Sequence, residues 1–331
     1  MTALPRVVSG IQPNGQLHLG SYLGAIRNWV ADQDKYDNFT FVANLHAMTV
    51  PHDADHLRTC TLDVAALYMA CGINPRQSTI FVQSDVPQHA ELGWLIQCFT
   101  PMGWLERMTQ FKDKSTASSR ERASSGLFTY PTLMAADILL YSADYVPVGD
   151  DQRQHIELCR DVAQRFNSQR GDVLKVPKPL IRDAGARVMG LDEPEIKMSK
   201  SIAQNRPGHA VFMLDDPATI RKKFKRAKTD TEPAVKKPMG AGVANLVDIY
   251  AATLSLTADE AYSKVDGSSY GELKTLVGDT VAATLEPIQE RYRQIRGDEA
   301  ALREQLAEAA VKAREIAGNT LERVYTAAGL R

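Results

Sequence analysis

Two short segments of the chain carry residues suited to binding a nucleotide. The first, His18-Leu19-Gly20-Ser21, follows an apolar run and a Pro13-Asn14-Gly15 turn. If a helix begins there, its first backbone N–H groups attract an anion, and Gly20 lets a flat base or a phosphate approach the backbone closely. A small residue that merely eases packing between helix and sheet is the alternative, and for this motif alone it is the commoner explanation.

The second segment is Lys197-Met198-Ser199-Lys200-Ser201, called the KMSKS segment below. Its two ammonium groups, three residues apart, can reach different oxygens of one polyphosphate. Phosphoryl and nucleotidyl transfer depend mainly on positioning and charge stabilisation, which paired lysines supply without a covalent step. A lysine-rich surface loop is the alternative for this segment.

A third segment, from Arg221 to Lys228, holds six cations in eight residues. Such a run is either the solvated face of a helix or a contact for the phosphates of RNA. The pattern alone does not separate these two interpretations.

The elements that must position these residues alternate between strand and helix. Helical periodicity begins at Leu19 and again covers 55–70, where Gly72 is placed to end the helix. This alternation predicts an α/β fold, a Rossmann-like doubly wound parallel sheet over 1–205, with a mobile basic excursion at about 105–126. The predicted strands are 6–9, 39–43, 79–82 and 145–148.

The strand signals stop after about residue 215. Helical periodicity then covers 245–256, 273–295 and 299–325. We therefore expect an all-helical second domain over 206–331.

Composition narrows the class of protein. The 331 residues are 44% hydrophobic, which excludes general disorder, and 39 Lys and Arg against 40 Asp and Glu exclude a strongly basic nucleic-acid binder. No apolar run is long enough to span a membrane, and the first residues do not have the form of a signal peptide. The four cysteines are far apart, so we expect no bound zinc or other metal, no disulfide framework and a cytoplasmic location.

In their order along the chain, the first two segments resemble the signatures of class I aminoacyl-tRNA synthetases. These signatures are a HIGH-type motif after the first strand and a KMSKS segment after the last. Further segments are similar to bacterial tryptophanyl-tRNA synthetases, and the likeness covers nearly the whole chain. These segments are Ser9–Pro13, Arg107–Lys112, Leu133–Tyr141 and Val146–Gln152.

The resemblance implies a tryptophan–tRNA ligase. Such an enzyme activates L-tryptophan with ATP and Mg²⁺, releases diphosphate, and transfers the tryptophanyl group to tRNA(Trp), releasing AMP. The resemblance also implies a homodimer and an anticodon-binding role for 206–331.

The same resemblance assigns residues to three roles. The catalytic lysines would be Lys114, Lys197 and Lys200. ATP would be bound by Gln12, Pro13, Asn14, His18, Gly20, Ser21, Gly149, Asp150, Asp151, Val188, Lys197, Met198, Ser199, Lys200 and Ser201. Tryptophan would be bound by Asp137, Met134, Tyr130, His46 and Gln152.

The predicted tryptophan-binding residues also have a physical interpretation. Tyr130, Met134 and Asp137 are spaced to share one face of a helix, and we expect Pro131 in its first turn. An aromatic ring, a thioether and a carboxylate suit an indole, which needs apolar walls and one acceptor for its N–H. Periodicity alone favours the alternative that Met134 belongs to the core and Asp137 caps or pairs, whereas the resemblance favours the indole.

Three other functions remain open. A tyrosyl-tRNA synthetase would share the fold and the reaction. The pair Met134 and Asp137 argues against this function. Val8 keeps it open, because tryptophanyl-tRNA synthetases usually have an aromatic residue at that position. A synthetase-like paralogue that only binds RNA or a protein would not need Lys197 and Lys200. A plain nucleotidyltransferase would not explain the helical region after the KMSKS segment.

Overall fold

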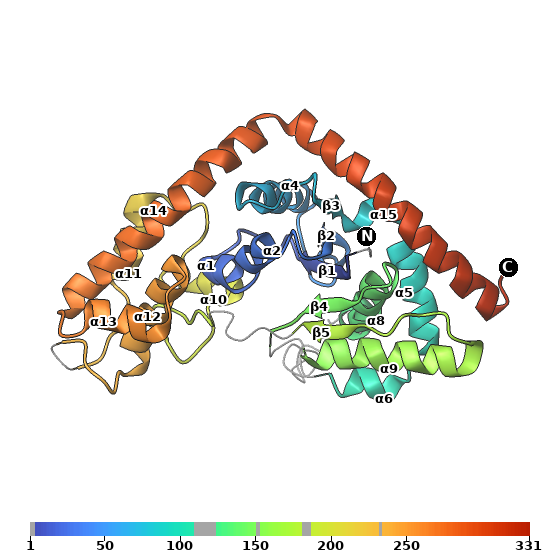
Figure 1. Cartoon of the computed structure of the whole chain (residues 1–331), viewed down its shortest axis with the longest axis horizontal. Helices are drawn as coiled ribbons and strands as arrows, with labels where there is room; N and C mark the ends of the chain where they lie inside the picture. The colour runs from blue at the N-terminus through green and yellow to red at the C-terminus, as the bar shows by residue number, and fades with distance from the viewer. Residues whose placement is uncertain (1–3, 109–123, 150–152, 181–186, 232–233) are drawn as a thin grey trace.

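The computed structural model describes residues 4–108, 124–149, 153–180, 187–231 and 234–331 (Figure 1). Four predicted site residues lie outside these ranges: Lys114, Asp150, Asp151 and Gln152. Most of the basic excursion predicted at 105–126 also lies outside them.

Within the described ranges, five parallel strands form the sheet, in the order β3-β2-β1-β4-β5. The chain builds outward from β1 to β3 and then crosses back to β4 beside β1, so the predicted doubly wound parallel sheet is confirmed. In such sheets ligands bind beyond the carboxyl ends of the strands where the order reverses, which here lies between β1 and β4. The strands are β1 (Arg6–Ile11), β2 (Asp37–Val42), β3 (Ser78–Val82), β4 (Tyr145–Pro147) and β5 (Lys178–Leu180).

The two helices that periodicity predicts in the α/β part, one from Leu19 and one over 55–70, are present. The helix after β1 is interrupted by a π-helical segment, and Leu19, Leu23 and Ile26 are buried along it. Gly72, with φ +110°, follows α4 and ends it, as predicted. The elements are α1 (Leu19–Ser21), η1 (Tyr22–Ile26), α2 (Arg27–Ala31), α3 (Asn44–Ala47), α4 (Ala54–Ala70), η2 (Gln83–Asp85), α5 (Gln88–Phe99), α6 (Met102–Glu106), α8 (Ser125–Leu139) and α9 (Arg153–Arg170).

The prediction that Pro131 lies in the first turn of its helix is wrong. Helix α8 begins at Ser125, well before Pro131, because Ser124 caps it by accepting a hydrogen bond from the N–H of Leu127. Pro131 is therefore inside the helix, where it cannot donate to the carbonyl of Leu127. The spacing of Tyr130 and Asp137 on one face is unaffected.

The chain after the sheet is helical, as predicted. Helix α14 begins at a capping box, in which Ser269 and Glu272 each bond the other's backbone N–H. It then extends to the α/β part, where Arg291 donates to the carbonyl of Ala70 at 2.6 Å. These helices are α10 (Lys200–Asn205), α11 (Pro217–Lys225), α12 (Ala241–Leu254), α13 (Ala258–Val265), α14 (Tyr270–Gly297) and α15 (Glu299–Ala328).

The last helix leaves the other C-terminal helices and packs on the sheet. Helices α14 and α15 form a wide V, and α15 lies along β3 and α5 (Figure 1). Small side chains, Ala310, Ala313 and Ala317, are fully buried on the inner face of α15 and let it approach Phe81 of β3. The loss of strand signals, from which we drew the 206–331 boundary, gives no sign of this return.

No single helix among the described residues is long and apolar enough to cross a bilayer. Helices α12 and α13 would satisfy length and composition only if taken together, and they are bent by 114° at their junction.

Two cations of the basic run on α11 have partners within the protein. Arg221 pairs with Asp279 at 2.6 Å, and the half-buried Lys223 pairs with Asp215 at 2.6 Å and donates to the carbonyl of Ala210. Part of this run therefore holds α11 in place, and the whole run is not a free basic surface.

Candidate active site

The KMSKS segment lies against the turn that follows β1. The ammonium of Lys200 donates to the side-chain oxygen of Asn14 and to the carbonyl of Gly15, both at 3.2 Å. Gly15 has φ +97°, which glycine adopts without strain. The turn before the first predicted nucleotide-binding segment therefore lies in contact with the second.

His18 shapes the start of the first helix. Its Nδ1 accepts a hydrogen bond from the N–H of Ser21 at 3.3 Å, so the side chain caps α1. A Cβ on Gly20 would lie 3.0 Å from His18 Nδ1 and 3.5 Å from the Cβ of Val188. Gly20 thus faces two predicted ATP-binding residues and not the sheet, and the close approach of His18 leaves little room there for a larger residue.

The backbone of the KMSKS segment is held in place by contacts with the core and with the neighbouring loop. Met198 is buried, and its N–H donates to the carbonyl of Val188 at 3.0 Å. Ser199 caps α10 by accepting from the N–H of Ile202. Because Met198 points into the core, the two flanking lysines are held by a rigid backbone rather than by a loose surface loop.

The electrostatics of this site favour an anion. Burial lowers the pKa of Lys200 to about 8. Burial, together with the positive charges of Lys200 and Lys197 and the nearby His209, lowers the pKa of His18 to about 4. At neutral pH His18 is thus an uncharged acceptor beside two ammonium groups, and bound phosphates would relieve the repulsion between these cations.

A second cluster surrounds the buried carboxylate of Asp137, which is 2% exposed. Its Oδ1 accepts from Nε2 of Gln83 at 2.7 Å and from Nδ1 of His89 at 2.6 Å, and its Oδ2 accepts from Nε2 of His46 at 2.7 Å. Burial alone would raise the pKa of Asp137, but the two histidines outweigh it and lower that pKa. Asp137 is therefore an ionised carboxylate inside the protein.

The hydrogen bonds leave one acceptor position on Asp137. A carboxylate offers about four lone-pair positions. Among the described residues, Gln83 and His89 occupy those of Oδ1 and His46 occupies one on Oδ2. The remaining position lies on Oδ2, so this oxygen can accept one more N–H.

Tyr141 orients His89, one of the donors to the Asp137 carboxylate. Nε2 of His89 lies 2.8 Å from the hydroxyl of Tyr141, whose pKa burial raises well above its usual value. The phenol thus stays protonated and donates to Nε2, which leaves Nδ1 of His89 as the donor to Asp137. Both His89 and Tyr141 are fully buried, so their positions are fixed by packing.

His46, which donates to Oδ2, lies close to Tyr130. Their rings are 6.3 Å apart and nearly perpendicular. The hydroxyl of Tyr130 lies 2.7 Å from Nε2 of His155 on α9, and burial raises the pKa of Tyr130 to about 12. His46 is 5% exposed, and its Nδ1 makes no hydrogen bond to the described residues.

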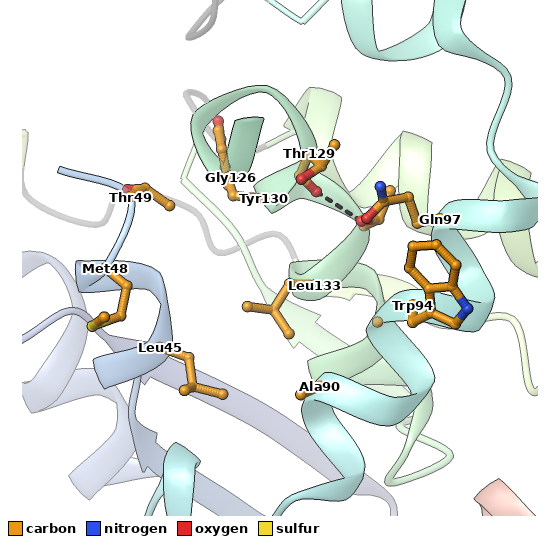
Figure 2. A pocket seen from close by; sticks show the side chains of 12 residues that line it. Leu45, Met48, Thr49, Ala90, Trp94, Gln97, Gly126, Thr129, Tyr130 and Leu133 are labelled. Carbon is orange, nitrogen blue, oxygen red and sulfur yellow. Dashed lines mark hydrogen bonds between the residues drawn. The ribbon is translucent and has the colours of Figure 1, made fainter. Parts of the chain in front are cut away.

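Figure 2 shows a groove of about 310 Å³ on the outer side of this cluster. Helix α3 supplies Leu45, and Met48 follows its last residue. Helix α5 supplies Trp94, and α8 supplies Tyr130 and Leu133. Trp94 is 65% exposed and Met48 is 57% exposed, which is unusual for large apolar side chains.

The structure thus gathers most of the predicted site residues that it describes into two clusters. Gln12, Pro13 and Asn14 follow β1, and Gly149 follows β4, at the strand ends where the sheet order reverses. Gln83, His89, Tyr141 and His155 also contribute to these clusters, and we did not predict them from the sequence. Gln83 was detectable, because it is the first polar residue after an apolar strand; a histidine within an apolar helix, such as His89, gives no such signal.

Comparison with known proteins places the chain in a family. Residues 2–286 match the tRNA synthetases of class I (W and Y). A tryptophan–tRNA ligase of Wolinella succinogenes is 47% identical over 326 residues, which is 98% of either chain. The chain belongs to the class I tryptophanyl-tRNA synthetases.

Solved structures of this family superpose over nearly the whole chain. The tryptophanyl-tRNA synthetase of Campylobacter jejuni complexed with ADP and tryptophan is 36% identical, with a TM-score of 0.83, over 98% of this chain and 99% of that one. The enzyme of Mycoplasma pneumoniae is 33% identical, with a TM-score of 0.91, over 99% and 98%. A tyrosyl-tRNA synthetase of Aeropyrum pernix, at 19% identity and a TM-score of 0.65, shares the fold.

The bond between Tyr141 and His89 predicts a measurable energetic coupling. Tyr141→Phe should cost about 1–2 kcal/mol of unfolding free energy, since Nε2 of His89 loses its donor. His89→Leu should cost about 3–5 kcal/mol, since it removes a donor from a buried charge. In the His89→Leu background Tyr141→Phe should add almost nothing, so urea unfolding should give a coupling energy of about 1–2 kcal/mol.

Tyr262→Phe is the matched control for this cycle, because its hydroxyl bonds Asp266 in the helical part of the chain. Its cost should add to that of His89→Leu. Additive costs for Tyr141→Phe as well would contradict the coupling.

Proposed function

We propose that this chain is a tryptophan–tRNA ligase. It joins tryptophan to ATP as tryptophanyl-adenylate, and then transfers the tryptophanyl group to tRNA(Trp) during protein biosynthesis in the cytoplasm. The observation that carries the proposal is the oriented carboxylate of Asp137, with one acceptor position left for an N–H donor. The relatives support it, since the Wolinella protein has this name and the Campylobacter structure holds tryptophan and ADP.

The first step needs no nucleophile from the protein. An oxygen of the tryptophan carboxylate attacks the α-phosphorus of ATP, and the bond to the departing diphosphate breaks. Lys197 and Lys200 offset the charge that develops on the phosphates, and we assign Lys114 the same role by family resemblance. Mg²⁺ enters as part of the substrate, bound to the triphosphate.

The ATP site that we propose lies at the switch point of the sheet. Its adenine side is the pair Gly20 and Val188, which are already in close approach. The ribose lies toward the residues after β4, and the phosphates lie toward the lysines. The full set is Gln12, Pro13, Asn14, His18, Gly20, Ser21, Gly149, Asp150, Asp151, Val188 and Lys197 to Ser201.

In the tryptophan site, Oδ2 of Asp137 accepts the indole N–H. Met134 lines the ring, and His46 lies beside the accepting oxygen. Tyr130 and Gln152 bind the α-ammonium group. A buried acceptor of this kind discriminates strongly, because a ligand without an N–H leaves it unpaired.

Asp137→Asn tests the proposed function through this discrimination. In tryptophan-dependent exchange of diphosphate into ATP, kcat/KM for tryptophan should fall about 100-fold or more. β-(3-Benzothienyl)alanine is the matched control, because sulfur replaces the indole N–H, and its kcat/KM should change little. An equal loss with both amino acids, or unchanged preference for tryptophan, would contradict the assignment of Asp137.

Lys200 predicts how ATP use depends on pH. Because burial lowers its pKa to about 8, the ammonium loses its charge as pH rises through this value. In the free enzyme kcat/KM for ATP should fall tenfold per pH unit above it, as for one essential proton. Lys200→Arg keeps the positive charge, so kcat/KM for ATP, although lower overall, should stay constant to higher pH. If kcat/KM of this variant declines above the same pH as in the wild type, the role of Lys200 is refuted.

We propose that the chain is a homodimer, which the exposed apolar residues around the groove of Figure 2 support. Trp94 and Met48 on its walls and Met102 on α6 are each more than half exposed. Trp94→Glu should convert a dimer to a monomer in sedimentation velocity, while Val311→Glu, at an exposed residue of α15, should not. A wild-type monomer at micromolar concentration would contradict the proposal.

We also propose that 206–331 binds the anticodon part of tRNA(Trp). The cations of α11 whose side chains are exposed, such as Lys222 and Lys225, are available for the RNA backbone. Cross-linking of bound tRNA to the α/β part alone would refute this.

A further inference from the structure

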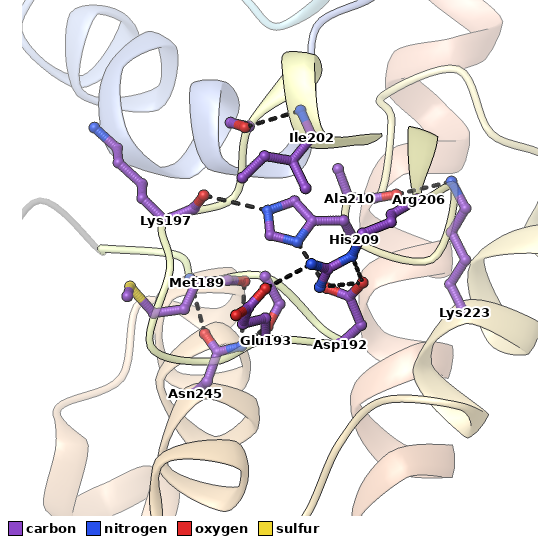
Figure 3. A network of polar contacts seen from close by, with 12 residues as sticks. Met189, Asp192, Glu193, Lys197, Ile202, Arg206, His209, Ala210, Lys223 and Asn245 are labelled. Carbon is purple, nitrogen blue, oxygen red and sulfur yellow. Dashed lines mark hydrogen bonds and ion pairs between the residues drawn. The ribbon is translucent and has the colours of Figure 1, made fainter. Parts of the chain in front are cut away.

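His209 lies beside Lys197, the first residue of the KMSKS segment, and is completely buried (Figure 3). Its Nδ1 is 2.7 Å from Oδ1 of Asp192, and its Nε2 is 3.3 Å from the carbonyl oxygen of Lys197. Both partners can only accept a hydrogen bond. Since a neutral imidazole carries one N–H, the two bonds together require the imidazolium form, whose charge Asp192 balances.

The surrounding backbone is shaped to hold this ring. A Cβ on Gly190 would lie 2.2 Å from Cε1 of His209, so only glycine fits there. The N–H of Leu191 donates to the carbonyl of His209 at 3.1 Å, and the N–H of Gly190 donates to the carbonyl of Ile196 at 2.8 Å. The ring and its backbone are therefore both tied to the loop that leads into the KMSKS segment.

Asp192 is also bound to the far end of α10. Arg206, which follows this helix, donates from Nε to Oδ2 of Asp192 at 2.8 Å and pairs with Glu193 at 2.6 Å. Burial alone would raise the pKa of Asp192, but its bonds to His209 and Arg206 lower it. One carboxylate thus holds both ends of the segment from Lys197 to Arg206.

His209 is connected through these bonds to Lys197, to which we assign phosphate binding. In Figure 3 the carbonyl of Lys197 faces His209, and its side chain extends to the opposite side. The chain after His209 is bonded to the first motif, since the N–H of Leu19 donates to the carbonyl of Val211 at 2.8 Å. His209 therefore lies where the two nucleotide-binding segments are joined.

We propose that His209 is a positioning residue for adenylate formation: as an imidazolium it clamps the carbonyl of Lys197 to Asp192 and so fixes the Lys197 ammonium for the phosphates of ATP. This inference rests on the proposed function of Lys197. His209 touches no reacting atom. It acts through the backbone on which the lysine is mounted.

Nuclear magnetic resonance of the intact enzyme, labelled with ¹⁵N at histidine, tests the charge directly. Long-range ¹H–¹⁵N spectra, assigned with His209→Gln, should show a proton on both ring nitrogens at pH 7. One unprotonated nitrogen would overturn the proposal. The charged and titratable groups around the ring are Asp192 and Glu193 of the loop, Arg206 after α10, His18 before α1, Lys197, and Lys223 of α11.

Kinetics of diphosphate exchange tests the positioning. His209→Leu should lower kcat about 10- to 100-fold, as expected for a misplaced catalytic group, with KM for tryptophan changed less than about twofold. His209→Gln keeps one donor and should recover part of the loss. His52→Gln, at an exposed histidine, is the control and should leave kcat unchanged.

Lys197→Ala separates the proposed function of Lys197 from the proposed positioning role of His209. If it does not slow exchange, the proposed function of Lys197 fails. If Lys197→Ala slows exchange but the folded His209→Leu and His209→Gln enzymes keep the wild-type kcat, the role of His209 is overturned. A fall in the thermal stability of the His209 variants with kcat intact would likewise leave His209 a purely structural residue.

Discussion

The hydrogen-bonded, buried carboxylate of Asp137 is the interaction on which the proposed tryptophan site depends. An ionised group away from water is costly unless donors meet its oxygens. Here the donors are His46 after β2, Gln83 after β3 and His89 on α5, while Asp137 lies on α8. Four separate segments must therefore be placed together, which the parallel sheet achieves by ending β2 and β3 at the same edge.

The proposed nucleotide site lies at the same edge of the sheet but is lined by positive charges. The whole chain has a net charge of −1, yet Lys197 and Lys200 are held close enough to His18 to lower its pKa. The fold keeps these cations near one another by anchoring the backbone between them, through Met198 in the core. A neutral protein thus presents a local positive site beside a buried negative one, which suits a reaction between a triphosphate and an amino acid with an N–H-bearing ring.

Much of the fold could be predicted from the sequence, because local patterns determine it. The β1, β2 and β3 runs are apolar and short, and Gly72 ends α4 because its positive φ suits glycine. Strand β5, Lys178–Leu180, was missed, since its three residues include a proline and no periodicity. The prediction that Pro131 lies in the first turn was wrong, because the cap at Ser124, several residues earlier, determines where α8 begins.

The site was less accessible to sequence reasoning wherever it depends on contacts distant in the chain. The pattern on α8 grouped Tyr130 with Asp137, but nothing local shows that His89 and Gln83 occupy one oxygen of that carboxylate and leave the other open. The return of α15 onto β3 is similarly hidden, because alanines at helical spacing are buried equally well against helices or against a sheet. Such pairings are decided by packing across the whole molecule.

The distance between Asp137 Oδ2 and the indole nitrogen, in a crystal structure of the enzyme with bound tryptophan, tests the account most directly. We predict a separation of about 2.7–3.2 Å, with Oδ1 still bonded to Gln83 and His89. An indole nitrogen that faces another acceptor or solvent, with Asp137 bonded only to protein groups, would contradict the account.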